Sequence, residues 1–292
     1  MPSQPHAGFS PSWNPHGVPR FVFLLGKPPR KSPVLPEIIT ALVDRGGDVE
    51  IHVPAAATDV PGDLPAADLV VIRGLGRAVL AALSAREAAD GLRCCNGAGA
   101  TLACADRALL GAALVAAGVP VPPTRVEADW DNVLRGATGS PVVVKARDAL
   151  RGRAAGVWLP SDGPLPDVQP FPGPYLLQRF VPSDGIDRKL YVLGGKVAGL
   201  HKSAGTAGAR RRDGIPVDPS HDLAALARSA AGAIGLELAG IDILEGPQGQ
   251  LVIDVNPFPS ARGVAGAAET IAAHLWHRAW KNMEGRRKSK SG

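Results

Sequence analysis

Aromatic residues and cysteines are scarce in this sequence of 292 residues. Phe, Trp and Tyr together make up 4% of it, so a hydrophobic core must be built mainly from Ala, Val, Leu and Ile. The three cysteines, Cys94, Cys95 and Cys104, show neither a CxxC spacing nor a disulfide framework, which fits a reducing cytoplasm. We expect buried and unreactive thiols at these positions.

Long hydrophobic runs are absent. No stretch of 18 or more apolar residues occurs, so the sequence predicts no membrane span. Residues 1–19 contain Pro, Ser, Gly and His without an apolar segment, which argues against a signal peptide and favours a flexible leader. Together with the cysteine pattern, these observations predict a cytoplasmic protein.

Several common site motifs are missing as well. The sequence has no GxGxxG fingerprint, and the stretch from Gly26 to Pro29 is too short and too rich in proline for a phosphate-binding P-loop. No Ser/His/Asp or Cys/His arrangement for nucleophilic catalysis is visible. His274 and His277 share one face of a helix, but no third ligand accompanies them, so we predict no metal site there.

Positive charge is concentrated at one end of the chain. The formal net charge is +5, and residues 281–292 contribute +4 of it through five basic residues against Glu284. We expect residues 284–292 to form a basic tail, either as a solubilising end or as a contact for nucleic acid or an acidic partner. The rest of the chain has no basic stripe interleaved with aromatics, so it gives no indication of a nucleic-acid partner.

Residues 20–97 alternate between apolar strands and helical patterns, which is typical of a parallel sheet covered by helices. We predict strands at 21–26, 48–53, 68–74 and 92–96, and helices at 34–46 and 77–90. One helix rich in Ala and Leu is predicted at 102–118, where a Pro-rich segment ends it. We place a domain boundary near residue 97.

Residues 141–159 hold a buried strand, a loop and a second extended segment at 157–159. Lys145 closes the first strand, and a loop that contains glycine and arginine follows it. A strand, a Gly-containing loop and a second strand are the arrangement of a flap that folds over phosphates. The alternative for Lys145 is a surface lysine whose stem lies along apolar groups. Another buried strand is predicted at 175–181.

A hairpin with a Gly-Gly turn is predicted at 187–202. Because side chains alternate across a strand, Lys189 and Tyr191 share one face of it. The Gly/Ala loop that follows carries three consecutive arginines, which form either a solvated patch or an anion site: Arg210, Arg211 and Arg212. Further helices are predicted at 220–234 and 264–281.

The most informative stretch is a second hairpin, at 240–257. If its turn is centred on Gln248, Asp242 lies opposite Asp254, and Asn256 lies two residues further along the same face. Two opposed carboxylates, about 5 Å apart in an apolar hairpin, destabilise a sheet unless a cation lies between them. Hard oxygen ligands suit Mg²⁺ or Mn²⁺ better than zinc. The other face carries the predicted core residues Ile241, Ile243, Ile253 and Val255.

The alternative for this hairpin is a solvated face with incidental acids. A slip of one residue in the register would separate the pair.

The order of these motifs resembles the ATP-grasp superfamily, and within it the ribosomal-protein glutamate ligase group. The resemblance covers residues 20–281 and is most specific in the Asp242 and Asp254-x-Asn256 set. It implies an α/β (α+β) fold in which an N-terminal parallel α/β domain precedes two lobes that enclose a nucleotide. The implied bounds are 20–97 for the N-terminal domain and 98–283 for the ATP-grasp domain, with a small lobe at 124–181 and a large lobe at 182–283.

The resemblance also implies roles for individual residues. Asp242, Asp254 and Asn256 would bind Mg²⁺ (or Mn²⁺) that bridges the β and γ phosphates of ATP. Lys189 and Arg211 would face the transferred phosphoryl group or an acyl phosphate. Lys145 would hold phosphates, the strand 178–181 would meet the adenine edge, and Asp187 would meet the ribose. The full set of implied nucleotide-binding positions is Arg107, Lys145, Gln178, Arg179, Phe180, Val181, Asp187 and Lys202.

The chemistry implied by the resemblance is phosphorylation of a carboxylate to an acyl phosphate, followed by attack of an amine. The partners would be a small-molecule or peptide carboxylate and an amine. Arg107 and Arg179 depart from the lysine and the acidic residue that are common in the family, and Asp254 replaces the commoner Glu. The Pro-Phe-Pro that follows Asn256 is similar to the inositol polyphosphate kinase branch. Two alternatives therefore remain open, a small-molecule kinase and a degenerate nucleotide-binding regulatory protein.

Overall fold

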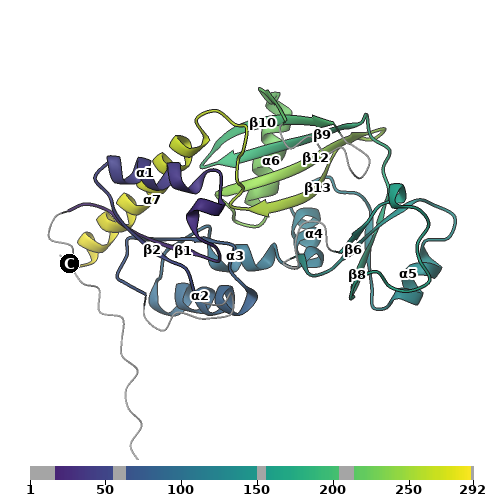
Figure 1. Cartoon of the computed structure of the whole chain (residues 1–292), viewed down its shortest axis with the longest axis horizontal. Coiled ribbons are helices and arrows are strands. Elements are labelled where there is room, and N and C mark those ends of the chain that lie inside the picture. Colours follow the sequence, from purple (N-terminus) through teal and green to yellow (C-terminus); the bar gives the residue numbers. More distant parts are fainter. Residues whose placement is uncertain (1–16, 55–63, 150–155, 204–213, 291–292) are drawn as a thin grey trace, which may run out of the picture.

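The computed structural model describes residues 17–54, 64–149, 156–203 and 214–290, and three β-sheets follow one another along it (Figure 1). A four-stranded sheet with helices α1, α2 and α7 lies at one end, a five-stranded sheet lies in the middle, and a smaller four-stranded sheet with α5 lies at the other end. This mixed architecture confirms the predicted α/β class. Within the described residues, every helix is too short or too polar to cross a membrane.

The N-terminal sheet is parallel, with the strand order β2-β1-β3-β4. Its central strand β1 is buried because helices cover both faces of the sheet, as is usual for parallel sheets. The predicted alternation of strands and helices is confirmed. The bounds are Arg20–Leu25 for β1, Asp48–His52 for β2, Leu69–Arg73 for β3, Cys94–Cys95 for β4, Leu35–Asp44 for α1, Arg77–Asp90 for α2 and Pro29–Lys31 for the short 3-10 helix η1.

The C-terminal helix α7, Ala267–Lys290, returns to this N-terminal sheet and packs beside α1 (Figure 1). Its apolar side chains and those of β1 belong to one core, which also includes residues of the middle sheet. The last helix of the chain therefore ties the first sheet to the middle one. Prominent members of this core are Phe21, Phe23, Leu42, Tyr191, Leu238, Ile271 and Leu275.

Helix α7 is longer than predicted. The sequence pattern ended it at residue 281 and gave residues 284–292 to a tail, whereas the helix runs to Lys290. The added turns are held in place because Arg286 pairs with the carboxylate of Asp68 and donates to the carbonyl of Ala67 at 3.1 Å.

The single helix predicted at 102–118 is wrong. Two helices occupy this stretch, α3 at Ala98–Ala103 and α4 at Arg107–Ala116. Asp106 separates them because its carboxylate caps α4, accepting hydrogen bonds from the backbone N–H groups of Ala108 and Leu109 at 2.9 and 3.2 Å. The start of α4 is thereby fixed at the residue after the cap.

The small sheet has the order β5-β8-β6-β7, and its predicted strands β6 and β8 pair antiparallel. Trp130 and Tyr175 pack edge to face with ring centroids 5.2 Å apart and anchor its core, so this lobe has a hydrophobic centre of its own. The bounds are Thr124–Glu127 for β5, Val142–Ala146 for β6, Val157–Trp158 for β7, Tyr175–Arg179 for β8, Trp130–Gly136 for α5 and Pro160–Asp162 for the 3-10 helix η3.

The middle sheet is antiparallel, with the order β11-β10-β9-β12-β13. Gly194 and Gly195 have φ angles of 61° and 97°, as a two-residue turn with positive φ at both positions requires, which confirms the predicted hairpin. The bounds are Ile186–Leu193 for β9, Lys196–Ser203 for β10, Ile215–Val217 for β11, Leu238–Gly246 for β12, Gly249–Pro257 for β13 and His221–Gly232 for α6.

Candidate nucleotide and metal site

The predicted acid pair comes together on the middle sheet. Asp242 of β12 lies directly opposite Asp254 of β13 in the strand register. Asn256 lies beside Asp254, since its Nδ2 donates to Asp254 Oδ2 at 3.1 Å. The register prediction is therefore confirmed for these three residues, and two carboxylates and an amide share one small area.

A β-bulge follows the acid pair. The predicted register holds as far as Asp242, but Ile243 then pairs with Val252, so that Ile253 is the extra residue. The prediction that Ile253 lies on the core face is wrong for this reason. Val252 takes the core position and is 2% exposed, whereas Ile253 is only half-buried.

Lys145 reaches the hairpin at this bulge. It is the fourth residue of β6, in the small lobe, and its Nζ donates to the carbonyl oxygen of Ile253 at 3.0 Å. Burial lowers the pKa of Lys145, while the nearby carboxylates of Asp254 and Asp242 raise it. The lysine thus places a positive charge from one lobe beside the acids of the other, and it is not a solvated surface residue.

Lys189 lies on the other side of the acids. It is the register partner of Asp242 in the neighbouring strand β9, and its Nζ forms an ion pair with Asp242 Oδ1. Burial raises the pKa of Asp242, the Lys189 ammonium opposes this effect, and the charge of Asp254 adds to it. A cation close to Asp242 therefore stabilises the charged form of its carboxylate.

Arg107 is the first residue of α4, and its side chain points at the small lobe. Its Nη1 donates to the carbonyl of Ala146 at 2.7 Å, one residue beyond Lys145. Burial lowers the pKa of Arg107, and the charges of Asp254 and Asp148 raise it. Arg107 and Lys145 therefore lie together within the field of Asp254.

Asp106 is a site residue that the sequence reasoning missed. Besides capping α4, it accepts hydrogen bonds from Arg147 Nε at 2.9 and 2.8 Å, and the backbone N–H of Arg107 donates to the carbonyl of Arg147 at 3.0 Å. These bonds join the start of α4 to the residues that follow β6. An aspartate before an Ala/Leu-rich run is an N-cap signal, which could have identified the helix boundary.

The proposed adenine strand lies where the small lobe meets the middle sheet. Gln178 and Arg179 end β8, and Phe180 donates its backbone N–H to the carbonyl of Pro141 at 3.0 Å. Val181 follows and packs against Gly246, at the turn of the β12–β13 hairpin. These four residues thus form the connection between the two sheets and are brought next to the tip of the acid-bearing hairpin.

Asp187 and Lys202 are register partners on β9 and β10. Asp187 is two residues from Lys189, so both lie on the same face of β9, and the charge of Asp187 contributes to the raised pKa of Asp242. The predicted residue Arg211, with Arg210 and Arg212, lies outside the described residues.

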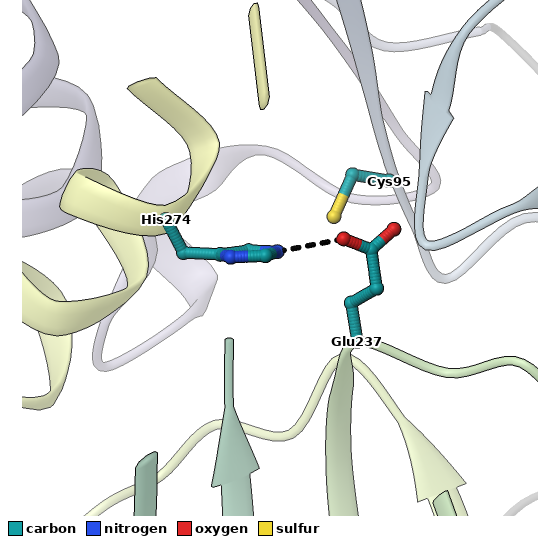
Figure 2. A group of neighbouring side chains, drawn as sticks. All are labelled: Cys95, Glu237 and His274. Carbon is teal, nitrogen blue, oxygen red and sulfur yellow. Dashed lines mark hydrogen bonds and ion pairs between the residues drawn. The ribbon is translucent and has the colours of Figure 1, made fainter. Parts of the chain in front are cut away.

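The cysteines are buried, as predicted, and burial raises the pKa of all three thiols, to about 12 in Cys104. Cys95 lies with Glu237 and His274 in a cluster whose candidate ligand atoms are all within 4.8 Å of one another (Figure 2). Glu237 accepts from His274 Nε2 at 2.9 Å and also pairs with Arg278. A guanidinium already occupies the second carboxylate oxygen, so the cluster is an ion network between β12 and α7.

Comparisons with known proteins bear on this arrangement. No protein-family profile matches the chain. The probable alpha-L-glutamate ligase 1 of Pseudoalteromonas atlantica is 31% identical over 173 residues, which cover 54% of this chain and 57% of that protein. The chain spans about half the length of the curated relatives it matches.

Solved structures cover more of the chain. The RimK domain protein ATP-grasp from Sphaerobacter thermophilus is 23% identical, with a TM-score of 0.65 over 88% of this chain and 99% of that one. The chain has the ATP-grasp fold. A second structure of this fold, the ATP-grasp ligase PsnB complexed with its minimal precursor, Mg and ADP, is 18% identical, with a TM-score of 0.61 over 89% of this chain and 97% of that one.

The predicted fold is thereby confirmed, as is the likeness to glutamate ligases. Within this fold, basic residues from β6 and α4 lie beside the acid-bearing strands of the middle sheet.

Proposed function

We propose that this ATP-grasp protein is an ATP- and Mg²⁺-dependent carboxylate–amine ligase that works through an acyl phosphate. The observation that carries the proposal is the meeting of Asp242, Asp254 and Asn256 with the cations Lys145 and Lys189. Phosphoryl transfer depends on positioning and on neutralising charge, and this set supplies both without a protein nucleophile. The names of the relatives support ligation over a kinase function.

The donor set fits Mg²⁺ or Mn²⁺. Two carboxylates and an amide are hard oxygen ligands, and burial with mutual repulsion raises the pKa of Asp242, so a divalent cation would be favoured there. When bound, the metal would neutralise negative charge on the β and γ phosphates. Asp242, Asp254 and Asn256 would hold it from one face of the middle sheet.

The side chains around the acids take the remaining roles. Lys145 and Arg107 hold phosphate oxygens, because both are cations within the field of Asp254. Lys189 turns from Asp242 to the transferred phosphoryl group. The strand from Gln178 through Arg179 and Phe180 to Val181 receives the adenine, and Asp187 with Lys202 lies toward the ribose.

The reaction proceeds in two steps. A carboxylate oxygen of the first substrate attacks the γ-phosphorus of ATP, the bond to the bridging oxygen breaks, and ADP leaves. The amine nitrogen of the second substrate then attacks the acyl carbon, phosphate leaves, and the nitrogen loses a proton. The carboxylate belongs to a small molecule or a peptide, a class that the precursor peptide bound to PsnB supports.

In this proposal the small lobe, residues 124–181, and the large lobe, residues 182–283, enclose the nucleotide, while residues 20–97 form the preceding domain. The three buried free thiols support a cytoplasmic location.

Phosphate release tests the proposed function. The protein is incubated with ATP, Mg²⁺ and pools of amino acids and short peptides, with single-class pools as controls. We expect phosphate only when a carboxylate and an amine are both present, together with a product whose mass equals the sum of the two less water. A phosphorylated hydroxyl compound would contradict ligation, and so would nucleotide binding without turnover in every pool.

A further inference from the structure

The hairpin that carries the three acid and amide ligands has an open end, at the start of β12 and the finish of β13. The carboxyl edge of the N-terminal sheet lies against this end, because the last residue of β3 and the residue after β4 contact it. Strand ends on this edge of a parallel sheet are where side chains meet ligands in open α/β folds. In this protein, side chains at two of these strand ends bind backbone groups of the hairpin instead.

Asn96 follows β4 and is 1% exposed. Its Oδ1 accepts hydrogen bonds from the backbone N–H groups of Glu237 and Leu238 at 2.9 and 2.8 Å, and its Nδ2 donates to the carbonyl of Leu238 at 2.8 Å. One amide thus satisfies three backbone groups at the first residues of β12. A buried side chain with this many bonds fixes the strand's position, since none of its partners has water as a substitute.

Arg73, the last residue of β3, binds the other strand of the hairpin. Its Nε donates to the carbonyl of Phe258 at 3.2 Å, and its guanidinium lies over the Phe258 ring, 5.9 Å from the centroid. Phe258 is two residues beyond Asn256 and has a φ of 45°, a left-handed conformation that a bulky residue adopts only when its surroundings hold it there.

The two contacts are joined through one carbonyl. Leu238 accepts both from Asn96 Nδ2 and from the backbone N–H of Phe258, at 2.8 and 2.9 Å. Glu237 is fixed in turn by His274 of α7 (Figure 2). Arg278 of the same helix pairs with its other carboxylate oxygen. The two strand ends therefore cannot shift independently.

We infer that Arg73 and Asn96 form a clamp by which the N-terminal domain sets the orientation of the metal ligands Asp254 and Asn256. Both are positioning residues, because they act through backbone groups of the hairpin. The inference rests on the proposed function, because that function supplies the metal. The contacts of Arg73 and Asn96 with the hairpin do not depend on it. The loss of a side chain that orients metal ligands without contacting the metal often weakens metal affinity by about 10- to 100-fold.

The test uses Arg73→Gln, which removes the guanidinium, and Arg73→Lys, which keeps a charge and a donor. Arg20→Gln is the matched control. Arg20 is the first residue of β1, so it lies at the amino-terminal end of the strands, and it pairs with Asp48 and Glu50 at 3.3 and 3.0 Å. Asn96→Ala is a second probe. Because it removes three buried hydrogen bonds and endangers folding, the conclusion is drawn from the Arg73 variants.

Two readouts are compared in these full-length variants. Hydrogen exchange of the unliganded protein follows the backbone amides of residues 251–262. Titration with Mn²⁺ in the presence of ADP, followed by electron paramagnetic resonance, gives the metal dissociation constant. We expect Arg73→Gln to speed exchange in that segment and to weaken Mn²⁺ binding by about tenfold, with Arg73→Lys in between and Arg20→Gln like the wild type.

Unchanged exchange in Arg73→Gln would overturn the clamp. Faster exchange with an unchanged Mn²⁺ constant would also overturn it, since Arg73 would then be a purely structural contact. A wild-type protein that binds no Mn²⁺ would contradict the proposed function and the metal part of the inference with it. The exchange comparison would still test whether Arg73 holds the end of the hairpin.

Discussion

The ammonium of Lys189 lies on the carboxylate of Asp242, and the two residues face each other across neighbouring strands. Both side chains are mostly buried, at 16% and 19% exposure, and Asp254 lies next to Asp242 in the strand beyond. A lysine therefore neutralises one of two adjacent acids in the unliganded protein. We expect this lysine to be released when a divalent cation takes its place.

Lys189→Met should destabilise the unliganded protein and spare the liganded one. Removing one partner of a mostly buried ion pair leaves a charge uncompensated, at a cost of about 2–3 kcal/mol after partial exposure is allowed for. Urea unfolding with and without Mg²⁺-ADP measures the change. We expect the ligand to recover most of the loss, and Lys196→Met, at the exposed first residue of β10, to have no effect. Equal losses with and without ligand would contradict this account of Lys189.

Arg107 should be replaceable by lysine but not by an uncharged residue. Its charge lies within the field of Asp254, and lysine would keep that charge. Arg107→Met should weaken ATP binding by about 10- to 100-fold, the loss expected for a charge-assisted hydrogen bond, while Arg107→Lys stays close to the wild type. Calorimetric titration with Mg²⁺-ATP measures both. Tight binding by Arg107→Met would remove this residue from the phosphate site.

Asp106→Ala should affect both stability and nucleotide binding. It removes the N-cap of α4, which costs about 1 kcal/mol. It also removes the partner of the Arg147 side chain, two residues after Lys145. Asp129→Ala is the matched control, because Asp129 caps α5 through the backbone N–H of Asn132 at 2.8 Å. Both variants should lose similar stability by urea unfolding, but only Asp106→Ala should lose ATP affinity. If the two lose equal affinity, Asp106 has no special connection to the site.

Glu237→Gln should flatten the dependence of stability on acid pH. Burial raises the pKa of Glu237, but hydrogen bonds from His274 and Arg278 outweigh it and hold the pKa below the ordinary 4.5. A carboxyl with a lowered folded-state pKa stabilises the protein above its unfolded pKa, and this stability is lost as pH falls through the folded value. Urea unfolding from pH 6 down to 3 should therefore show a steeper loss in the wild type than in Glu237→Gln. Parallel curves would rule out this contribution.

The acid pair was predictable because its causes are local. A Gly/Pro-rich turn and alternating apolar residues set the register of the hairpin, so that Asp242 and Asp254 could be paired from spacing alone. The Gly194-Gly195 turn followed from the same reasoning. Lys145 was predictable as the end of a buried strand, but its partner, the Ile253 carbonyl, was not, since it depends on a bulge and on another lobe.

The contacts that hold the site together come from segments far apart in sequence. Arg73 and Phe258 are 185 positions apart, and Asn96 and Leu238 are 142 apart, so no periodicity or spacing connects them. The extension of α7 to Lys290 likewise depends on Arg286 finding Asp68. Local patterns gave the elements and the acids, whereas the packing that orients them required the assembled fold.

Metal binding by the acid pair tests the central claim most directly. Mn²⁺ is titrated into the wild type and Asp254→Asn in the presence of ADP, with electron paramagnetic resonance as the readout. Asparagine keeps the shape of the side chain and removes one of two opposed charges, so the unfolding free energy should change by no more than about 1 kcal/mol. We expect Mn²⁺ binding in the wild type and a loss of about 100-fold in Asp254→Asn, whereas equal binding by the two proteins would contradict the assignment of Asp242, Asp254 and Asn256 as the metal site.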